Sequence, residues 1–254
     1  MPYPKRKKRK KFRAILEEQY GKGLPFAVYR KPEGVDIRAI LQEDALLDTE
    51  LDLSRPGFHI APFNDKDTPA VCIRADRSYL TDCKGQLPKA APAPHLTDTL
   101  AREIHMQLVQ KSIEALKKGI LEKVVVSRRF SLAISGDVLD IFFHLTRTFP
   151  KAFSYIWYHP EAGTWLGATP ERLLRYHSGM AETIALAGTR PSDSKDSAPV
   201  WTEKERHEQA LVTRFILDQI DQKNMHPETG SVKNVRAGKV WIPWGGRHGG
   251  GRQF

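Results

Sequence analysis

Two polar side chains, an amine and a carboxylate, stand beside predicted strands. Lys123 directly precedes three valines, residues 124–126, which predict a buried strand running to about Ile134. A lysine at this position either holds its ammonium in water or forms a partly desolvated amine that can act as a base. Glu171 follows a tight turn at residues 167–170, which places a carboxylate at the exit of a strand. An ordinary solvated loop glutamate fits the same pattern.

A third candidate, Glu208, lies in a helical pattern over residues 203–221. It comes three and four residues before Leu211 and Val212, which places it on the apolar stripe of the predicted helix. A carboxylate in that position must be paired, hydrogen-bonded or bound to a cation. Two interpretations follow, a buried salt bridge to an arginine or a hard cation such as Mg²⁺, which prefers oxygen ligands and keeps several waters.

Helical periodicity predicts the elements that must position these groups. The helix over 203–221 begins with a capping box, Thr202 with Glu205. A second helix over 98–118 carries apolar residues at helical spacing and ends at Gly119. A shorter helix is predicted from about residue 140 to 149.

Short β-prone runs separated by turn residues predict the strands. They cover residues 25–30, 57–63, 71–74, 152–158, 163–167, 173–176 and 180–186, of which 152–158 and 163–167 form a hairpin. These strands with helices packed against them predict an α+β fold.

Net charge and cysteine content narrow the class of protein. The chain has 254 residues and a net charge of +10, but residues 1–13 hold eight basic residues without an acid, and residues 14–241 are balanced. We therefore expect residues 1–23 to form a disordered basic arm. No aromatic residues stand between the lysines to stack on bases, which favours a solvated tail over an arm that binds RNA. No apolar run could span a membrane, and two cysteines suit a reducing cytoplasm.

Four motifs occur in the chain in a fixed order. They are Lys-Val-Val-Val-Ser-Arg at 123–128, Gly-Ala-Thr-Pro-Glu at 167–171, Ala-Leu-Ala-Gly-Thr-Arg at 185–190 and Lys-Glu-Arg-His-Glu at 204–208. Together they resemble the chorismate-binding enzymes, most closely the isochorismate synthases, over a partial domain at residues 24–241. The resemblance implies large antiparallel sheets with helices on the outside.

The resemblance also implies roles for the three candidate residues. The position of Lys123 activates a water that attacks C2 of chorismate, and the position of Glu171 protonates the leaving C4 hydroxyl. The position of Glu208 helps to hold Mg²⁺, which orients the substrate carboxylate. The protein implied is a cytoplasmic, magnesium-dependent isochorismate synthase with chorismate as its small-molecule substrate.

Two positions favour the branch of the family that uses water. The loop Ala187, Gly188 and Thr189 resembles the loop that lies along the substrate. Members that use ammonia generally lack a lysine at the position of Lys123, and members that form aminodeoxychorismate often carry one at the position of Ala187. Salicylate synthase also uses water first and stays open, as does the pathway served, menaquinone or siderophore biosynthesis.

The end of the chain departs from the family pattern. After Trp241 the family continues with further strands and a second metal-binding glutamate, whereas residues 242–254 are rich in glycine and arginine. We expect these residues to form an aberrant tail that cannot pack as a strand, and the short chain to have little activity alone. The alternative class is a non-catalytic remnant or a nucleic-acid-binding protein with basic ends.

Overall fold

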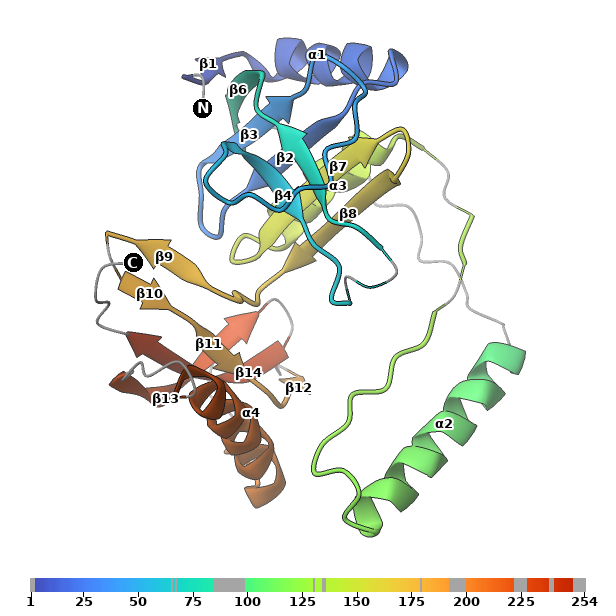
Figure 1. Ribbon diagram of the computed structural model, residues 1–254, viewed down its shortest axis with the longest axis vertical. Helices are drawn as coiled ribbons and strands as arrows, with labels where there is room; N and C mark the ends of the chain where they lie inside the picture. Colours follow the sequence, from blue (N-terminus) through green and yellow to red (C-terminus); the bar gives the residue numbers. More distant parts are fainter. Residues whose placement is uncertain are drawn as a thin grey trace. The chain divides into compact units, whose positions relative to one another are not determined.

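The chain folds into two compact units, Met1–Lys89 with Asp137–Glu171 and Ala90–Gly136 with Arg172–Phe254 (Figure 1). The computed structural model describes residues 3–64, 66, 68–84, 99–129, 131–133, 136–178, 180–191, 200–221, 228–237 and 240–248. Helices and strands occur in both units, which confirms the predicted α+β class.

A six-stranded sheet forms the centre of the first unit. Its order is β1-β6-β3-β2-β7-β8, and all neighbours are antiparallel except β1 and β6. The strands are β1 (Lys5–Arg6), β2 (Phe26–Arg30), β3 (Asp36–Leu41), β6 (Arg77–Asp82), β7 (Phe153–His159) and β8 (Gly163–Thr169). The predicted hairpin is confirmed, since β7 and β8 pair from Phe153 opposite Thr169 to His159 opposite Gly163. A separate pair, β4 (Gly57–Ile60) and β5 (Val71–Arg74), is also antiparallel.

Alternation along the strands gives this sheet two buried faces. Phe26 and Val28 of β2 pack in one cluster with residues of helices α1 (Arg9–Gly21) and α3 (Val138–Thr148). Ala27, between them, belongs to a second cluster with Val71 and Ile73 of β5. This period of two is what a sheet covered on both faces requires.

Helix α1 corrects the expectation that residues 1–23 are disordered. Phe12 and Leu16, one helical turn apart, are buried against the sheet, and Arg13 forms ion pairs with Asp137 and Asp140 at the start of α3. The apolar spacing was present in the sequence. Asp137 and Asp140, which bind Arg13, lie more than a hundred residues away, so the charge pattern of residues 1–13 alone does not predict these ion pairs.

The second unit combines two long helices with small sheets. The helices are α2 (Thr99–Lys117) and α4 (Glu203–Asp221), and the strands are β9 (Arg175–His177), β10 (Met180–Glu182), β11 (Ile184–Leu186), β12 (Arg190–Pro191), β13 (Glu228–Ala237) and β14 (Val240–His248). Strand β14 pairs antiparallel with β11, β12 and β13, and β9 pairs with β10. No helix of the described chain is long and apolar enough to cross a membrane.

Two further expectations are wrong in the second unit. Residues 123–129 form no strand, pair with no described strand and leave Val125 81% exposed, since a β-prone sequence alone does not supply the packing partners of a strand. Conversely, residues 242–248 of the expected tail belong to β14, where Ile242 pairs with Val235. Backbone pairing explains this strand, since ladder hydrogen bonds need no apolar periodicity. Residues 249–254 of the expected tail lie outside the described residues.

Candidate active site

Lys123 and Glu208 form an ion pair in the second unit. The Nζ atom of Lys123 donates a hydrogen bond to Oε1 of Glu208 at 2.9 Å, and the two side chains are 27% and 35% exposed. The salt-bridge interpretation of Glu208 therefore holds, but its partner is the lysine rather than an arginine. Two residues 85 positions apart, each singled out for chemistry, meet at one point beside helix α4.

A second ion pair lies next to the first. Nη2 of Arg214 is 2.5 Å from Oε2 of Glu122. The neighbouring residues Glu122 and Lys123, which belong to neither a helix nor a strand, thus each bind an oppositely charged side chain of α4. Between this segment and α4 lies a groove of about 400 Å³. Lys123 and Glu122 line it together with apolar side chains, among them Leu121 and Phe215. The groove therefore combines apolar walls with a charged group that can bind or move a proton.

The first turn of α4 binds the loop that contains Ala187, Gly188 and Thr189. Ala187 is buried, Thr189 is exposed, and Gly188 has a φ of +79°, a left-handed conformation that favours glycine. Arg190 follows and donates from Nε to Oε1 of Glu205 at 2.6 Å. The structure therefore fixes the loop to the helix that carries Glu208.

One half of the predicted capping box at the start of α4 is present, the bond from the Thr202 backbone N–H to the Glu205 carboxylate, and the Arg190 ion pair holds the same carboxylate. Oε2 of Glu205 accepts hydrogen bonds from the backbone N–H and the hydroxyl of Thr202, at 2.8 and 2.9 Å. Arg190 and Thr202 together lower the pKa of Glu205 from its ordinary 4.5 to about 2. Glu205 is thus an anion that holds both the loop and the start of the helix. The sequence predicted its contact with Thr202 but not its ion pair with Arg190.

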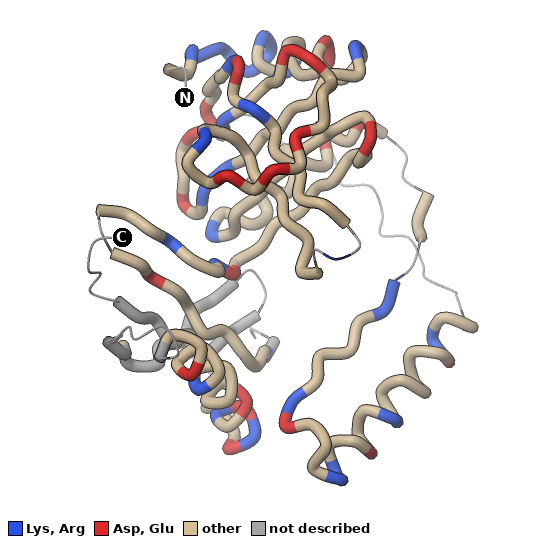
Figure 2. The backbone as a smooth tube through the Cα atoms, viewed as in Figure 1, with Lys and Arg blue, Asp and Glu red and all other residues tan. Residues whose placement is uncertain are grey.

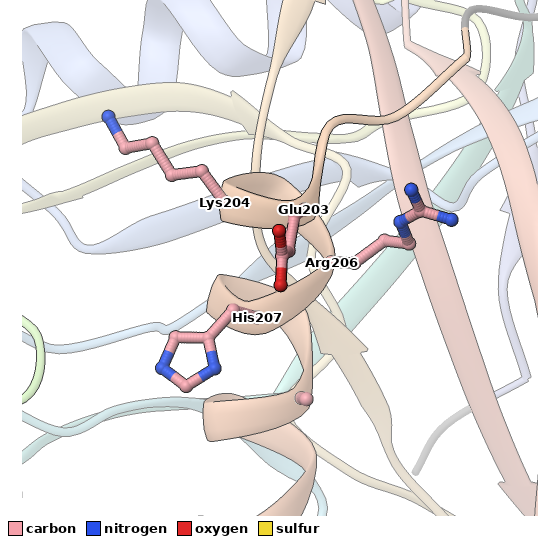
Figure 3. Close-up of a pocket in the computed structure, with 5 residues that line it drawn as sticks. Glu203, Lys204, Arg206 and His207 are labelled. Carbon is pink, nitrogen blue, oxygen red and sulfur yellow. The ribbon is translucent and has the colours of Figure 1, made fainter.

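Basic side chains surround the same helix start. Lys204, Arg206 and His207 line an open hollow of about 680 Å³ together with Glu203, and Figure 3 shows them splayed in different directions around the helix. Arg206 and Lys204 are exposed. They can attract a dianionic ligand to this surface, although the hollow does not enclose one.

Glu171 belongs to the first unit. It lies two residues after the end of β8, is exposed, and its backbone N–H donates to Oγ1 of Thr169 at 3.2 Å. The predicted position at the exit of a strand is confirmed. The structure brings Lys123, Glu208 and the loop together within one unit, whereas Glu171 ends the other unit.

The described residues do not build a magnesium site by themselves. Glu208 offers the oxygen ligand that a hard cation prefers, but one of its oxygens accepts from Lys123. Throughout the described ranges no group of three or more His, Cys, Asp or Glu side chains could hold a metal ion. A single carboxylate bonded to an ammonium does not form the shell that Mg²⁺ requires, so the magnesium assignment stays a prediction.

Comparison with known proteins places the chain in a family. The family described as chorismate binding enzyme matches residues 50–236. A relative, anthranilate synthase component 1 of Saccharolobus solfataricus, is 30% identical over 127 residues, which are 50% of this chain and 30% of the relative. The chain thus matches less than a third of that relative's length.

Two solved structures share the fold. One, from Bacillus anthracis, is described as a 2,3-dihydroxybenzoate-specific isochorismate synthase, DhbC, with a TM-score of 0.68 and 18% identity over 94% of this chain and 71% of that one. The other is the menaquinone-specific isochorismate synthase MenF of Escherichia coli, with a TM-score of 0.63 and 17% identity over 90% and 65%. These likenesses confirm the expected architecture. With a family match that covers most of its length, the chain belongs to the chorismate binding enzymes.

Proposed function

We propose that this chain acts on chorismate as an isochorismate synthase, adding water at C2 and releasing the C4 hydroxyl. One observation carries the proposal, the half-buried Lys123 held 2.9 Å from Glu208 and lining a groove with both charged and apolar walls. A positioned amine is the group that a water-using reaction needs and an ammonia-using reaction does not, because water is the weaker nucleophile.

In the proposed reaction Lys123 takes a proton from water as the oxygen bonds to C2. The ring double bonds shift, the C4–O bond breaks, and Glu171 protonates the departing hydroxyl so that it leaves as water. Lys123 can accept a proton only as a free amine, whereas in the ion pair it is an ammonium that donates to Glu208. The pair must therefore open, and Lys123 must lose its proton, before the chemical step. Glu208 has the positioning role, holding the amine at the groove until substrate arrives.

The second candidate function is ammonia-dependent formation of anthranilate. The 30% identity to an anthranilate synthase component 1 favours it. The resemblance discriminates against it, because ammonia-using members generally lack the lysine found here at residue 123. Product identity separates the two reactions directly.

The test is to incubate the full chain with chorismate and Mg²⁺, with and without ammonium, and to resolve the products by chromatography. The low activity expected from a tail that cannot pack as a strand loses its reason, because residues 242–248 pair within β14. We therefore expect isochorismate irrespective of ammonium. Lys123→Gln should lower turnover by about 10²-fold, the scale of a lost general base, while Lys118→Gln removes an exposed lysine nearby and serves as the matched control. Fluorescent anthranilate that requires ammonium would overturn the proposal, as would equal turnover of Lys123→Gln and wild type.

A further inference from the structure

We propose that the first unit carries a binding surface for the phosphate backbone of a nucleic acid. Residues 5–11 are seven consecutive basic residues, and the structure places them on β1 and the first turn of α1 rather than on a free arm. Figure 2 shows the resulting concentration of basic residues near the N terminus. We call its exposed lysines, Lys5, Lys8, Lys10 and Lys11, the lysine surface.

The arginines of this region are occupied by the protein itself. Arg6 pairs with Asp36 at 2.9 Å, and Arg9 donates to the backbone oxygen of Lys84 while its guanidinium lies 4.4 Å from the ring centroid of Phe143. Both therefore anchor the segment to the body of the unit.

The lysine surface is left without neutralising partners. All four lysines are exposed, and none forms an ion pair or side-chain hydrogen bond within the part of the chain that the structure describes. The neighbouring acids Asp36, Asp137 and Asp140 are bound by arginines instead. Among the described residues, four positive charges thus remain unpaired on β1 and at the start of α1.

This arrangement costs helix stability, which calls for a reason. Lys8 is the N-cap of α1 without a side-chain cap hydrogen bond, and the first turn holds no acid. Positive charge at the positive end of a helix dipole is unfavourable. Unfavourable charges of this kind at an exposed helix start are typical of a functional site. A bound anion would relieve the repulsion between the lysines and the positive end of the helix dipole.

The chemistry of the surface selects the partner. Lysines bind phosphate oxygens through charge alone. The two arginines of residues 5–11 are engaged within the protein, so neither is free to form paired hydrogen bonds with a base. A membrane-bound helix would offer apolar side chains to the lipid, but Phe12 and Leu16 are buried against the sheet. The surface therefore fits a phosphate backbone bound without base specificity.

The test measures binding of the full chain to a labelled 20-nucleotide oligouridylate by fluorescence anisotropy. Four neutralised phosphates predict that affinity falls roughly 50-fold between 50 and 200 mM salt, from a slope of about 0.7 per phosphate on a single strand. Replacing the lysine surface (Lys5, Lys8, Lys10 and Lys11→Gln) should weaken binding at least about 10-fold at 50 mM salt and flatten the salt dependence. The control replaces four other exposed lysines, Lys31, Lys66, Lys117 and Lys151→Gln, with the same change in net charge.

Each outcome decides the proposal. Loss in the first variant with retention in the control supports it, provided that the thermal midpoint of the first variant is not lowered. Equal loss in both variants would reduce the effect to net charge and overturn the proposal. Absence of oligouridylate binding at 50 mM salt would overturn it as well, and binding only to phosphatidylserine vesicles would assign the surface to a membrane instead.

Discussion

The two units differ sharply in how they bury apolar side chains. Both buried clusters of the described chain lie in the first unit, where Phe12, Phe26, Phe142 and Phe143 are almost fully enclosed. In the described part of the second unit the buried apolar residues are Ala185 and Ala187, while most long apolar side chains of α2 are exposed and those of α4, apart from the exposed Phe215, are only partly buried. The candidate amine and its glutamate lie in this second unit.

The described apolar clusters thus lie in the first unit, whereas Lys123 and Glu208 lie in the second. The first unit is held by apolar burial, which is the dominant stabilising effect in folding. In the described part of the second unit, elements are joined by ion pairs such as Lys123 with Glu208 and Arg190 with Glu205. Such regions open at low cost in free energy. A site on them can release the Lys123 ammonium when substrate binds.

The largest effect should come from the core of the first unit. Phe142 is fully buried, so Phe142→Ala should lower the free energy of unfolding by about 3–5 kcal/mol. Phe215 of α4 is 64% exposed, and Phe215→Ala should cost less than about 1 kcal/mol. Urea unfolding followed by circular dichroism measures both. Similar losses for the two substitutions would show that the second unit is packed as tightly as the first.

A smaller effect, of opposite sign, should come from the edge of the first unit. Lys8→Asp gives α1 the side-chain cap that it lacks and places a negative charge at the positive end of the helix dipole. We expect the free energy of unfolding to rise by about 1 kcal/mol. Lys31→Asp, which makes the same charge change at an exposed loop, is the control. An equal gain in the control would mean that net charge, not capping, sets the stability.

The smallest effect should appear in the second unit as a dependence on pH. Because its folded pKa is lowered to about 2, Glu205 stabilises the fold above its ordinary pKa of 4.5. That stabilisation should decline as pH falls from 4.5 toward 2 and be absent below. Thermal melts of wild type and Glu205→Gln across this range test it. The variant should be less stable at pH 6 and change less on acidification, and parallel curves would contradict the role of Glu205.

The sequence was sufficient wherever a feature is encoded locally. The helices α2, α3 and α4 and the β7–β8 hairpin follow from periodicity, and the bond between Thr202 and Glu205 from their spacing. These patterns work because the interactions that form them span only a few residues.

Sequence reasoning failed where distant residues decide the outcome. Helix α1 depends on Asp137 and Asp140, and β14 depends on pairing with β13. The partnership of Lys123 with Glu208 has no local signal either, although both residues were singled out separately. The valines at 124–126 predicted a strand from propensity alone, and propensity cannot supply the neighbouring edge that a strand needs.

The central claim is that water, activated at Lys123, becomes the new hydroxyl of the product. Turnover of chorismate by the full chain in water labelled with oxygen-18, in the presence of ammonium, tests this claim in one mass spectrum. The proposed reaction predicts isochorismate that carries the label at C2. An aminated product, or isochorismate without the label, would contradict it.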